Sequence, residues 1–230
     1  MINKCNLITH EQTKSFIAEA YRTLRTNIHF SKGDKQPKTI LFTSAAPGEG
    51  KSTTVANTAV SLAQAGNKVI VMDCDLRKPV QHRFFGRNYN GLTNLLTEHL
   101  PVEDLLQKTA VENLWLLSSG PIPPNPSELL GSKKMQKVLD YARKEADYVI
   151  IDTPPILAVT DACVLASKVD GVILVVGAGM IRPEMAQKAK ELLENVKGHL
   201  LGVVLNRVEL EQGHYYYYYG SYEQLVAKGG

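Results

Sequence analysis

Six short, continuously apolar segments alternate with stretches of helical periodicity along this chain. The apolar segments are TILFTS (39–44), KVIVMD (68–73), LWLLSS (114–119), YVIID (148–152), GVILVVG (171–177) and LLGVVLN (200–206). Helical patterns lie between them at 51–65, 126–144 and 183–197. Uninterrupted apolar runs are typical of strands that are buried on both faces. We therefore expect an α/β fold, in which a parallel sheet joined by right-handed crossovers is flanked by helices on both faces.

A further helix, at 10–30, is expected before the first strand. Thr9 and Gln12 have the spacing of a capping box, and apolar residues follow them at helical spacing. On the same helix three charged residues, spaced three apart, form a ridge: Glu19, Arg22 and Arg25. A solvated face is the ordinary explanation of such a ridge.

The size and composition of the chain fit one domain. With 230 residues and 44% hydrophobic content it can bury a full α/β core. No linker separates a second domain, so we expect one domain over 1–206 and a flexible tail over 207–230. The formal net charge of +3 is small and its charges are mixed along the chain, which argues against a nucleic-acid partner.

Cysteine usage and hydropathy predict a cytoplasmic protein. The three cysteines form no CxxC pair and are odd in number, so reduced thiols are expected. The longest apolar run, 172–176, is far shorter than the ~20 residues that cross a bilayer. The N-terminal segment lacks the apolar core of a signal peptide. Any attachment to a membrane is therefore expected to pass through a partner.

The first apolar segment runs into SAAPGEGKSTT (44–54), which predicts a phosphate-binding loop. Glycines let backbone N–H groups turn toward phosphates at the start of a helix, a lysine reaches the β- and γ-phosphates, and a serine hydroxyl can ligate Mg²⁺. Ala45 replaces the first glycine of the usual pattern. The expected nucleotide-binding residues of the loop are Gly48, Glu49, Gly50, Lys51, Ser52 and Thr53.

Three aspartates end two other apolar segments. VIVMDCDLR (69–77) carries Asp73 and Asp75 two residues apart, and VIIDTPP (149–155) carries Asp152. The carboxyl ends of parallel strands meet at the crevice where open α/β sheets bind ligands. A carboxylate at a strand end can also cap a helix, but three together indicate a Mg²⁺ shell with a base.

These motifs make the sequence recognisable. PGEGKST (47–53), VIVMDCDLR (69–77) and VIIDTPP (149–155) resemble the Walker A, Walker A′ and Walker B motifs of the bacterial tyrosine kinases, or BY-kinases. EAYRTLR (19–25) resembles the ExxRxxR pattern of that family, and the tyrosine-rich terminus matches it as well. The resemblance is to the separate kinase subunits of capsule and exopolysaccharide production, and it implies a P-loop fold using ATP and Mg²⁺.

The resemblance also implies roles for the site residues. Lys51 would bind phosphate, and Ser52 with Asp75 and Asp152 would hold Mg²⁺. Asp73 would be the base toward the acceptor hydroxyl, although the three aspartates could share or exchange these roles. Two residues at the end of the last strand are in the family's position for adenine contact: Asn206 and Arg207. A plain surface charge is the alternative for Arg207, and Arg77 is given no role.

The tail contains six of the ten tyrosines within eight residues. No strand or helix face can bury five in a row, so a structureless tail is expected. By resemblance these are the phosphate acceptors: Tyr215, Tyr216, Tyr217, Tyr218, Tyr219 and Tyr222. The family further implies a ring-shaped homo-oligomer, an octamer, built through the ridge on the first helix. It also implies an activating membrane adaptor, attachment to the inner face of the membrane through it, and a phosphotyrosine phosphatase that reverses the reaction.

Three other classes of function compete with this one. A partitioning or division-site ATPase would carry a lysine five residues before the loop lysine, where this chain has Ala46. A protein kinase of the eukaryotic type would need HRD and DFG motifs, which do not occur. A nucleotide-binding adaptor without catalysis stays open on the sequence.

Overall fold

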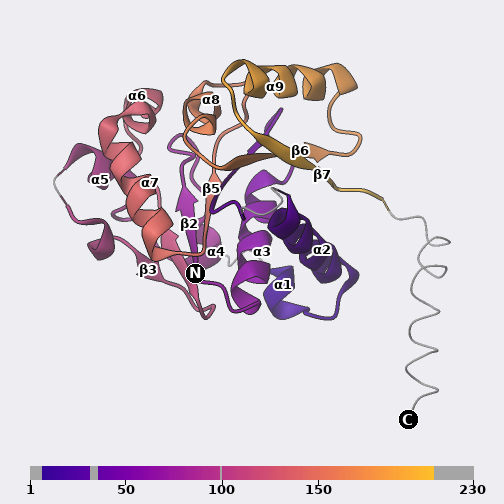
Figure 1. Ribbon diagram of the computed structural model, residues 1–230, viewed down its shortest axis with the longest axis horizontal. Coiled ribbons are helices and arrows are strands. Elements are labelled where there is room, and N and C mark those ends of the chain that lie inside the picture. The colour runs from indigo at the N-terminus through magenta and orange to yellow at the C-terminus, as the bar shows by residue number, and fades with distance from the viewer. Residues whose placement is uncertain (1–6, 32–35, 99, 210–230) are drawn as a thin grey trace, which may run out of the picture.

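The fold is an open, twisted sheet between two layers of helices (Figure 1). A computed structural model describes residues 7–31, 36–98 and 100–209. The strands are β1 Thr39–Ser44, β2 Val69–Asp73, β3 Gln107–Lys108, β4 Leu114–Leu117, β5 Tyr148–Asp152, β6 Gly171–Gly177 and β7 Leu200–Asn206. The helices are α1 Ile8–Glu11, α2 Phe16–Phe30, α3 Lys51–Gln64, α4 His82–Phe85, α5 Leu92–Thr97, α6 Pro126–Gly131, α7 Lys133–Glu145, α8 Asp161–Ala166 and α9 Pro183–Asn195, with a 3₁₀ turn at Val102–Asp104.

The strand order places the motif-bearing strands side by side. Within the described residues the order is β3-β4-β2-β5-β1-β6-β7, and each pair except β3–β4 is parallel. All six expected strands are therefore confirmed, and the α/β fold class with them. The two-residue antiparallel strand β3 at the edge was not expected. Because β5 lies between β1 and β2, the phosphate-binding loop and all three aspartates end at one edge of the sheet.

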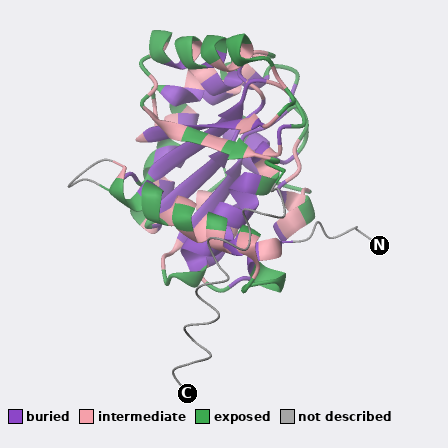
Figure 2. Ribbon diagram, turned by 90° about the vertical axis from the view of Figure 1, so that its right-hand side faces the viewer, coloured by how far each residue is buried: buried purple, intermediate pink, exposed green. Residues whose placement is uncertain are grey.

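Two apolar cores explain why the central strands read as continuous apolar runs. Every residue of β1, β2 and β5 is buried, and Figure 2 shows these strands as a purple layer inside the molecule. One core packs the sheet against α5 to α9, and the other packs it against α2 to α4 and Leu7, which directly precedes α1. The expected covering of both faces by helices is confirmed.

The helix expected at 10–30 is wrong in its first part. The chain forms α1, leaves helical geometry after Glu11, and begins α2 at Phe16. Ser15, rather than Thr9, caps α2, and its hydroxyl accepts a hydrogen bond from the Ala18 N–H at 3.2 Å. Thr9 is buried, and its hydroxyl donates to the side chain of Asn57 at 2.9 Å.

The expected helix at 126–144 is likewise divided. It forms α6 and α7, which meet at Ser132. The hydroxyl of that serine accepts a hydrogen bond from the Met135 N–H in the first turn of α7, at 3.1 Å. No helix within the described residues is long and apolar enough to cross a membrane.

Candidate active site

The phosphate-binding loop joins β1 to the start of α3. Gly48 and Gly50 both have φ of 86°, in the left-handed region that favours glycine. A Cβ atom on Gly50 would lie 2.0 Å from the amide nitrogen of Asn206, so a larger residue would displace that side chain. The loop thus delivers its backbone to the N-terminus of a 14-residue helix, where the helix dipole and free N–H groups favour anions.

The buried side chain of Glu49 fixes the conformation of this loop. Its two carboxylate oxygens accept backbone N–H bonds from Ala46 at 2.6 Å and from Gly177 at 2.8 Å. Its carbonyl oxygen accepts a bond from the Asn206 side chain at 2.9 Å. Glu49 and Asn206 therefore fasten the loop to the ends of β6 and β7. The carboxylate of Glu49 is occupied in this way, so any bond from this residue to a nucleotide would come from its backbone.

A cleft of about 440 Å³ opens beside the loop. It is lined by the loop, by Asp75, Arg77, Lys78 and Val80 on one side, by Pro154, Pro155, Ala158 and Val159 on another, and by Arg207. Asp73 and Asp152 are fully buried and do not line it. Of the predicted residues, the structure therefore brings the loop, the three aspartates and Arg207 together. Asn206 contacts the loop and is not part of the cleft wall.

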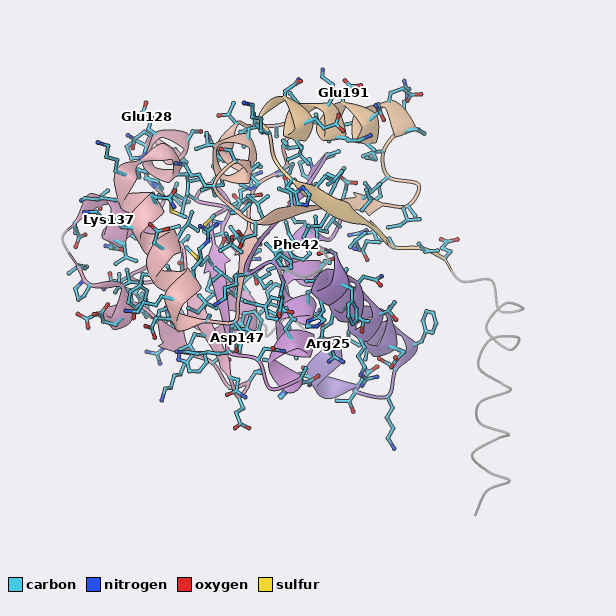
Figure 3. All side chains as sticks on the ribbon, in the orientation of Figure 1. Arg25, Phe42, Glu128, Lys137, Asp147 and Glu191 are labelled. Carbon is cyan, nitrogen blue, oxygen red and sulfur yellow. The ribbon has the colours of Figure 1, made fainter. Side chains whose placement is uncertain are left out.

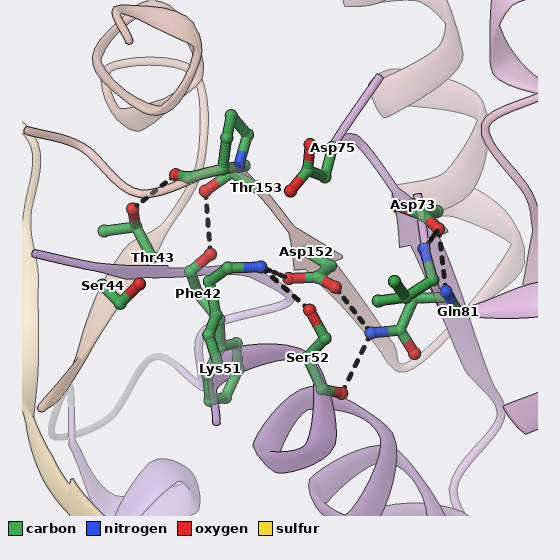
Figure 4. A network of polar contacts seen from close by, with 12 residues as sticks. Phe42, Thr43, Ser44, Lys51, Ser52, Asp73, Asp75, Gln81, Asp152 and Thr153 are labelled. Carbon is green, nitrogen blue, oxygen red and sulfur yellow. Dashed lines mark hydrogen bonds and ion pairs between the residues drawn. The ribbon is translucent and has the colours of Figure 1, made fainter. Parts of the chain in front are cut away.

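Lys51 and Asp152 form an ion pair at the floor of the site (Figure 4). The Lys51 ammonium donates to Oδ1 of Asp152 and to the Ser52 hydroxyl, the latter at 3.1 Å. The lysine side chain is 7% exposed and the aspartate 0%. This places the loop lysine within reach of both the Walker B carboxylate and the cleft.

Gln81 completes the network, and no sequence pattern marked it. Its amide donates to Oδ2 of Asp152 at 2.6 Å and to the Ser52 carbonyl at 3.0 Å. The glutamine directly precedes α4, three residues after the cleft residue Lys78. A lone polar residue in a short connection carries no periodicity, and only the topology reveals that it is buried among charges.

The two aspartates of the Walker A′ segment differ in environment. Burial, with the nearby negative charge of Asp152, raises the pKa of Asp73 to about 8. Oδ2 of Asp73 accepts N–H bonds from Val80 at 3.0 Å and Gln81 at 2.9 Å, while its buried Oδ1 has no partner in the described parts of the chain. Burial also raises the pKa of Asp75, which faces the cleft.

Arg77 has a structural role that the sequence did not suggest. Its guanidinium makes two bonds to Asp161, from Nε at 2.9 Å and from the terminal NH2 nitrogen at 3.0 Å, and a third to the Ser127 hydroxyl at 3.2 Å. Asp161 is fully buried at the start of α8, and Ser127 lies on α6. The segment that carries Asp75 is thereby tied to two helices of the neighbouring layer.

The residues expected to hold Mg²⁺ fit such an ion only in part. Ser52 and Asp75 both line the cleft, whereas both oxygens of Asp152 are engaged, by Lys51 and by Gln81. Across the described ranges, no cluster of three His, Cys, Asp or Glu side chains could hold a metal ion alone. This fits Mg²⁺, which is usually bound by one or two carboxylates together with substrate phosphates and water.

The predicted oligomerisation ridge lies on α2, and its members have contacts within the same chain. Arg22 pairs with Glu19 and donates to the Thr13 carbonyl. Arg25 donates to the Ser61 carbonyl on α3 at 2.9 Å; Figure 3 labels it where α2 meets α3. Glu19 and Arg22 are 45% and 36% exposed, so both can still meet another surface. The predicted acceptor tyrosines lie outside the described residues.

Comparison with known proteins agrees with this site. The AAA domain family matches residues 37–199. Tyrosine-protein kinase YwqD of Bacillus subtilis (strain 168) is 47% identical over 224 residues, which make up 97% of this chain and 94% of that protein. The putative tyrosine-protein kinase CapB of Staphylococcus aureus is 43% identical over 217 residues, 94% of this chain and 95% of that protein.

A solved structure extends the likeness to three dimensions. The crystal structure of the chimerical protein CapA2B2 superposes with a TM-score of 0.85 at 45% identity, over 89% of this chain and 90% of that one. Both the sequence and the fold therefore match proteins of one kind over nearly their whole length. The chain belongs to the bacterial tyrosine kinase family, of the capsule type, with its ATP-binding P-loop in an AAA domain.

Proposed function

We propose that this protein uses ATP to phosphorylate tyrosines, above all those of its own tail. The observation that carries the proposal is the meeting of the P-loop with the Walker carboxylates: Asp75 lines the same cleft as the loop, and Asp152 pairs with Lys51 (Figure 4). In the proposed step the tyrosine oxygen bonds to the γ-phosphorus, and the bond from that phosphorus to the bridging oxygen of ADP breaks. The hydroxyl proton passes to a carboxylate, because a tyrosine of pKa about 10 is a poor nucleophile at neutral pH.

Asp73 is the proposed base, and Asp75 is the second candidate. Asp73 has a buried oxygen without a partner in the described residues, and a pKa near the working pH suits a general base. Asp75 has the advantage of facing the cleft directly. Lys51 would turn from Asp152 to the β- and γ-phosphates, where its charge offsets the charge that develops in transfer.

Mg²⁺ is the proposed metal, held by Ser52 and Asp75 together with the phosphates, with Asp152 available once Lys51 has moved. When bound, it would neutralise phosphate charge and orient the γ-phosphoryl group. The residues of this chain do the rest: the loop N–H groups hold the phosphates, and Glu49 keeps the loop in shape.

We further propose that transfer occurs between subunits of a ring, an octamer by family resemblance. From Asn206 to Tyr215 there are nine residues, which span roughly 30 Å when extended. That reach permits a neighbour's cleft as well as the protein's own. Six phosphates, each of about −1.5 to −2 charge, would change the formal net charge of +3 to roughly −6 to −9. Such tails would repel one another and the aspartates, and so would loosen the ring.

A membrane adaptor is the proposed activator, and it would hold the kinase at the inner face of the membrane to regulate the synthesis and export of capsular polysaccharide. That a similar solved structure is of a chimerical protein named CapA2B2 is consistent with a partner's segment joined to a kinase of this family. A phosphotyrosine phosphatase would reset the tail.

A mixing experiment tests both the activity and its direction. Lys51→Met protein with an intact tail is combined with active protein whose six tail tyrosines are replaced by phenylalanine, in Mg·ATP. Phosphotyrosine on the inactive partner is the expected result, and it would show transfer between subunits. Label on wild-type protein alone, at a rate independent of concentration, would mean transfer within one chain. No phosphotyrosine in any mixture would favour the rival functions, an ATPase or a nucleotide-binding adaptor.

A further inference from the structure

Gln81 joins the three motifs of the active site. Its amide nitrogen bonds to Asp152 and to the carbonyl of Ser52, and its backbone N–H bonds to Asp73 at 2.9 Å. Its side chain is fully buried. One residue thereby fixes the Walker B carboxylate, the Walker A′ carboxylate and the start of α3 relative to one another, as Figure 4 shows.

The orientation of the Gln81 amide follows from its partners. The Ser52 carbonyl and the Asp152 carboxylate are both acceptors, so only the amide nitrogen can face them. The amide oxygen then remains buried without a partner in the described parts of the chain. An unsatisfied buried acceptor is unfavourable for folding. The fold retains it while both N–H bonds point into the active site, which favours a role in the site over a role in stability.

Nucleotide binding would remove one of the two donors to Asp152 and leave the other. Lys51 holds Oδ1 and Gln81 holds Oδ2. A P-loop lysine serves the phosphates when nucleotide is bound, whereas the Gln81 amide is also held by the Ser52 carbonyl. After Lys51 leaves, Gln81 is the donor that remains on a fully buried carboxylate. The other titratable groups around it, Asp73 and Asp75, are acids and supply no positive charge in place of Lys51.

We propose that Gln81 is a positioning residue that keeps Asp152 in place when Lys51 leaves it for the nucleotide. The inference rests on the proposed turn of Lys51 to the phosphates. With Oδ2 held by Gln81, the vacated Oδ1 has a fixed position from which it can accept a new partner in the cleft. Without Gln81, the carboxylate would lose both donors at the moment of reaction and would reorient.

Two variants test this role, with a matched control. Gln81→Met keeps the volume and removes both donated bonds, and Gln81→Glu keeps the shape and adds a carboxylate. Gln107→Met is the control, because Gln107 also donates to a carbonyl, that of Arg87 at 3.0 Å, and to a hydroxyl, that of Ser118 at 3.2 Å. Gln107 lies on the edge strand β3, which β4 and β2 separate from β5.

Kinetics supply the first readout. Gln81→Met is expected to bind Mg·ATP within about threefold of wild type but to lose about 10²-fold in kcat, as expected when a reacting group is misplaced. Gln81→Glu is expected to lower kcat further, because it places a second carboxylate against Asp152. The control should change neither. An unchanged kcat in both variants would overturn the proposal.

Thermal unfolding supplies a second readout that needs no kinase activity. The decrease in Tm caused by Gln81→Met should be about twice as large in a Lys51→Met background, because Asp152 then loses its last donor. Additive decreases would overturn the proposal even if the protein phosphorylates tyrosine. Non-additive decreases in a protein without phosphotyrosine would support Gln81 and reject the kinase function instead. Should Gln81→Met not fold, the same cycle with Gln81→Glu decides the question.

Discussion

Asp73 and Asp152 lie directly opposite each other on the neighbouring parallel strands β2 and β5. Both are fully buried, and two like charges in such a position disfavour ionisation of both together. Lys51 donates to Asp152, so the proton is expected to reside on Asp73. Burial, together with this register relationship, sets the protonation of Asp73.

Stability should therefore fall as pH rises because of Asp73. Its pKa is about 8 in the folded protein against an ordinary value of 3.8, so folding favours the protonated form. The stabilisation is complete below about pH 3.8 and is lost as pH rises to about 8. The asparagine of Asp73→Asn stays neutral, so the free energy of unfolding of this variant at pH 8 should exceed that of wild type by at least about 1.4 kcal/mol. At pH 5 the increase in the free energy of unfolding should be smaller.

Denaturant unfolding at the two pH values measures this difference. Asp104→Asn is the control, since Asp104 is exposed on the 3₁₀ turn. This substitution should change the free energy of unfolding by the same small amount at both pH values. If the stabilisation by Asp73→Asn, measured as the increase in the free energy of unfolding, is no larger at pH 8 than at pH 5, the raised pKa of Asp73 is contradicted.

Phosphorylation should show the opposite trend with pH. A base must be ionised before it can accept a proton, so kcat/KM should rise with an apparent pKa near 8. Asp73→Ala, Asp75→Ala and Asp152→Ala should each lower the rate by about 10²-fold or more, the last two with a weakened Mg²⁺ dependence. If all three variants stay within a few-fold of wild type, the chemistry takes place elsewhere.

Glu49→Gln should loosen the phosphate-binding loop. Both carboxylate oxygens of Glu49 accept N–H bonds, and the amide of glutamine would point a donor at one of these donors. We expect about tenfold weaker binding of an ATP analogue by calorimetry, with a loss of about 1–3 kcal/mol in stability. Glu191→Gln on the outer face of α9, labelled in Figure 3, should leave both quantities unchanged. Equal affinity in the two variants would remove Glu49 from the description of the loop.

The residues of the ridge on α2 should have two separable roles, Glu19 and Arg22 in assembly and Arg25 in stability. Glu19→Ala with Arg22→Ala should lower the mass measured by light scattering without loss of fold, because both side chains are partly exposed. Arg25→Ala should in addition lower Tm, since it removes the bond to the Ser61 carbonyl on α3. An unchanged mass in the triple variant would make the ridge a solvated face.

The sequence was sufficient for the sheet but not for the small elements. Strands buried on both faces, such as β1, β2 and β5, leave long apolar runs. The edge strand β7 is also an apolar run, although Val203 and Leu205 on it are exposed, so all six strands were found. β3 has two residues and α4 has four, and neither is long enough to show a period. The break between α1 and α2 was missed because the residues on either side of it resemble one continuous helix, and only Ser15 marks the restart.

The motifs located the site, but they did not reveal which residues hold its side chains and its loop in position. Walker motifs are recognisable because the phosphate, the metal and the carboxylates restrict residue type and spacing together. Glu49, Gln81 and Asp161 act through burial and long-range contacts, which depend on strand order. Such contacts join residues 71 to 128 positions apart, and no local pattern encodes them.

Asn206 is the last residue of β7, and its side chain donates a hydrogen bond to the carbonyl of Glu49. The tyrosines begin nine positions later on the same chain. If a neighbouring cleft binds a tail tyrosine, as proposed, tension along the tail would act on β7, whose last residue bonds to the nucleotide-binding loop. Through Asn206, the position of the tail in a neighbouring subunit would then affect how firmly this subunit holds its own nucleotide.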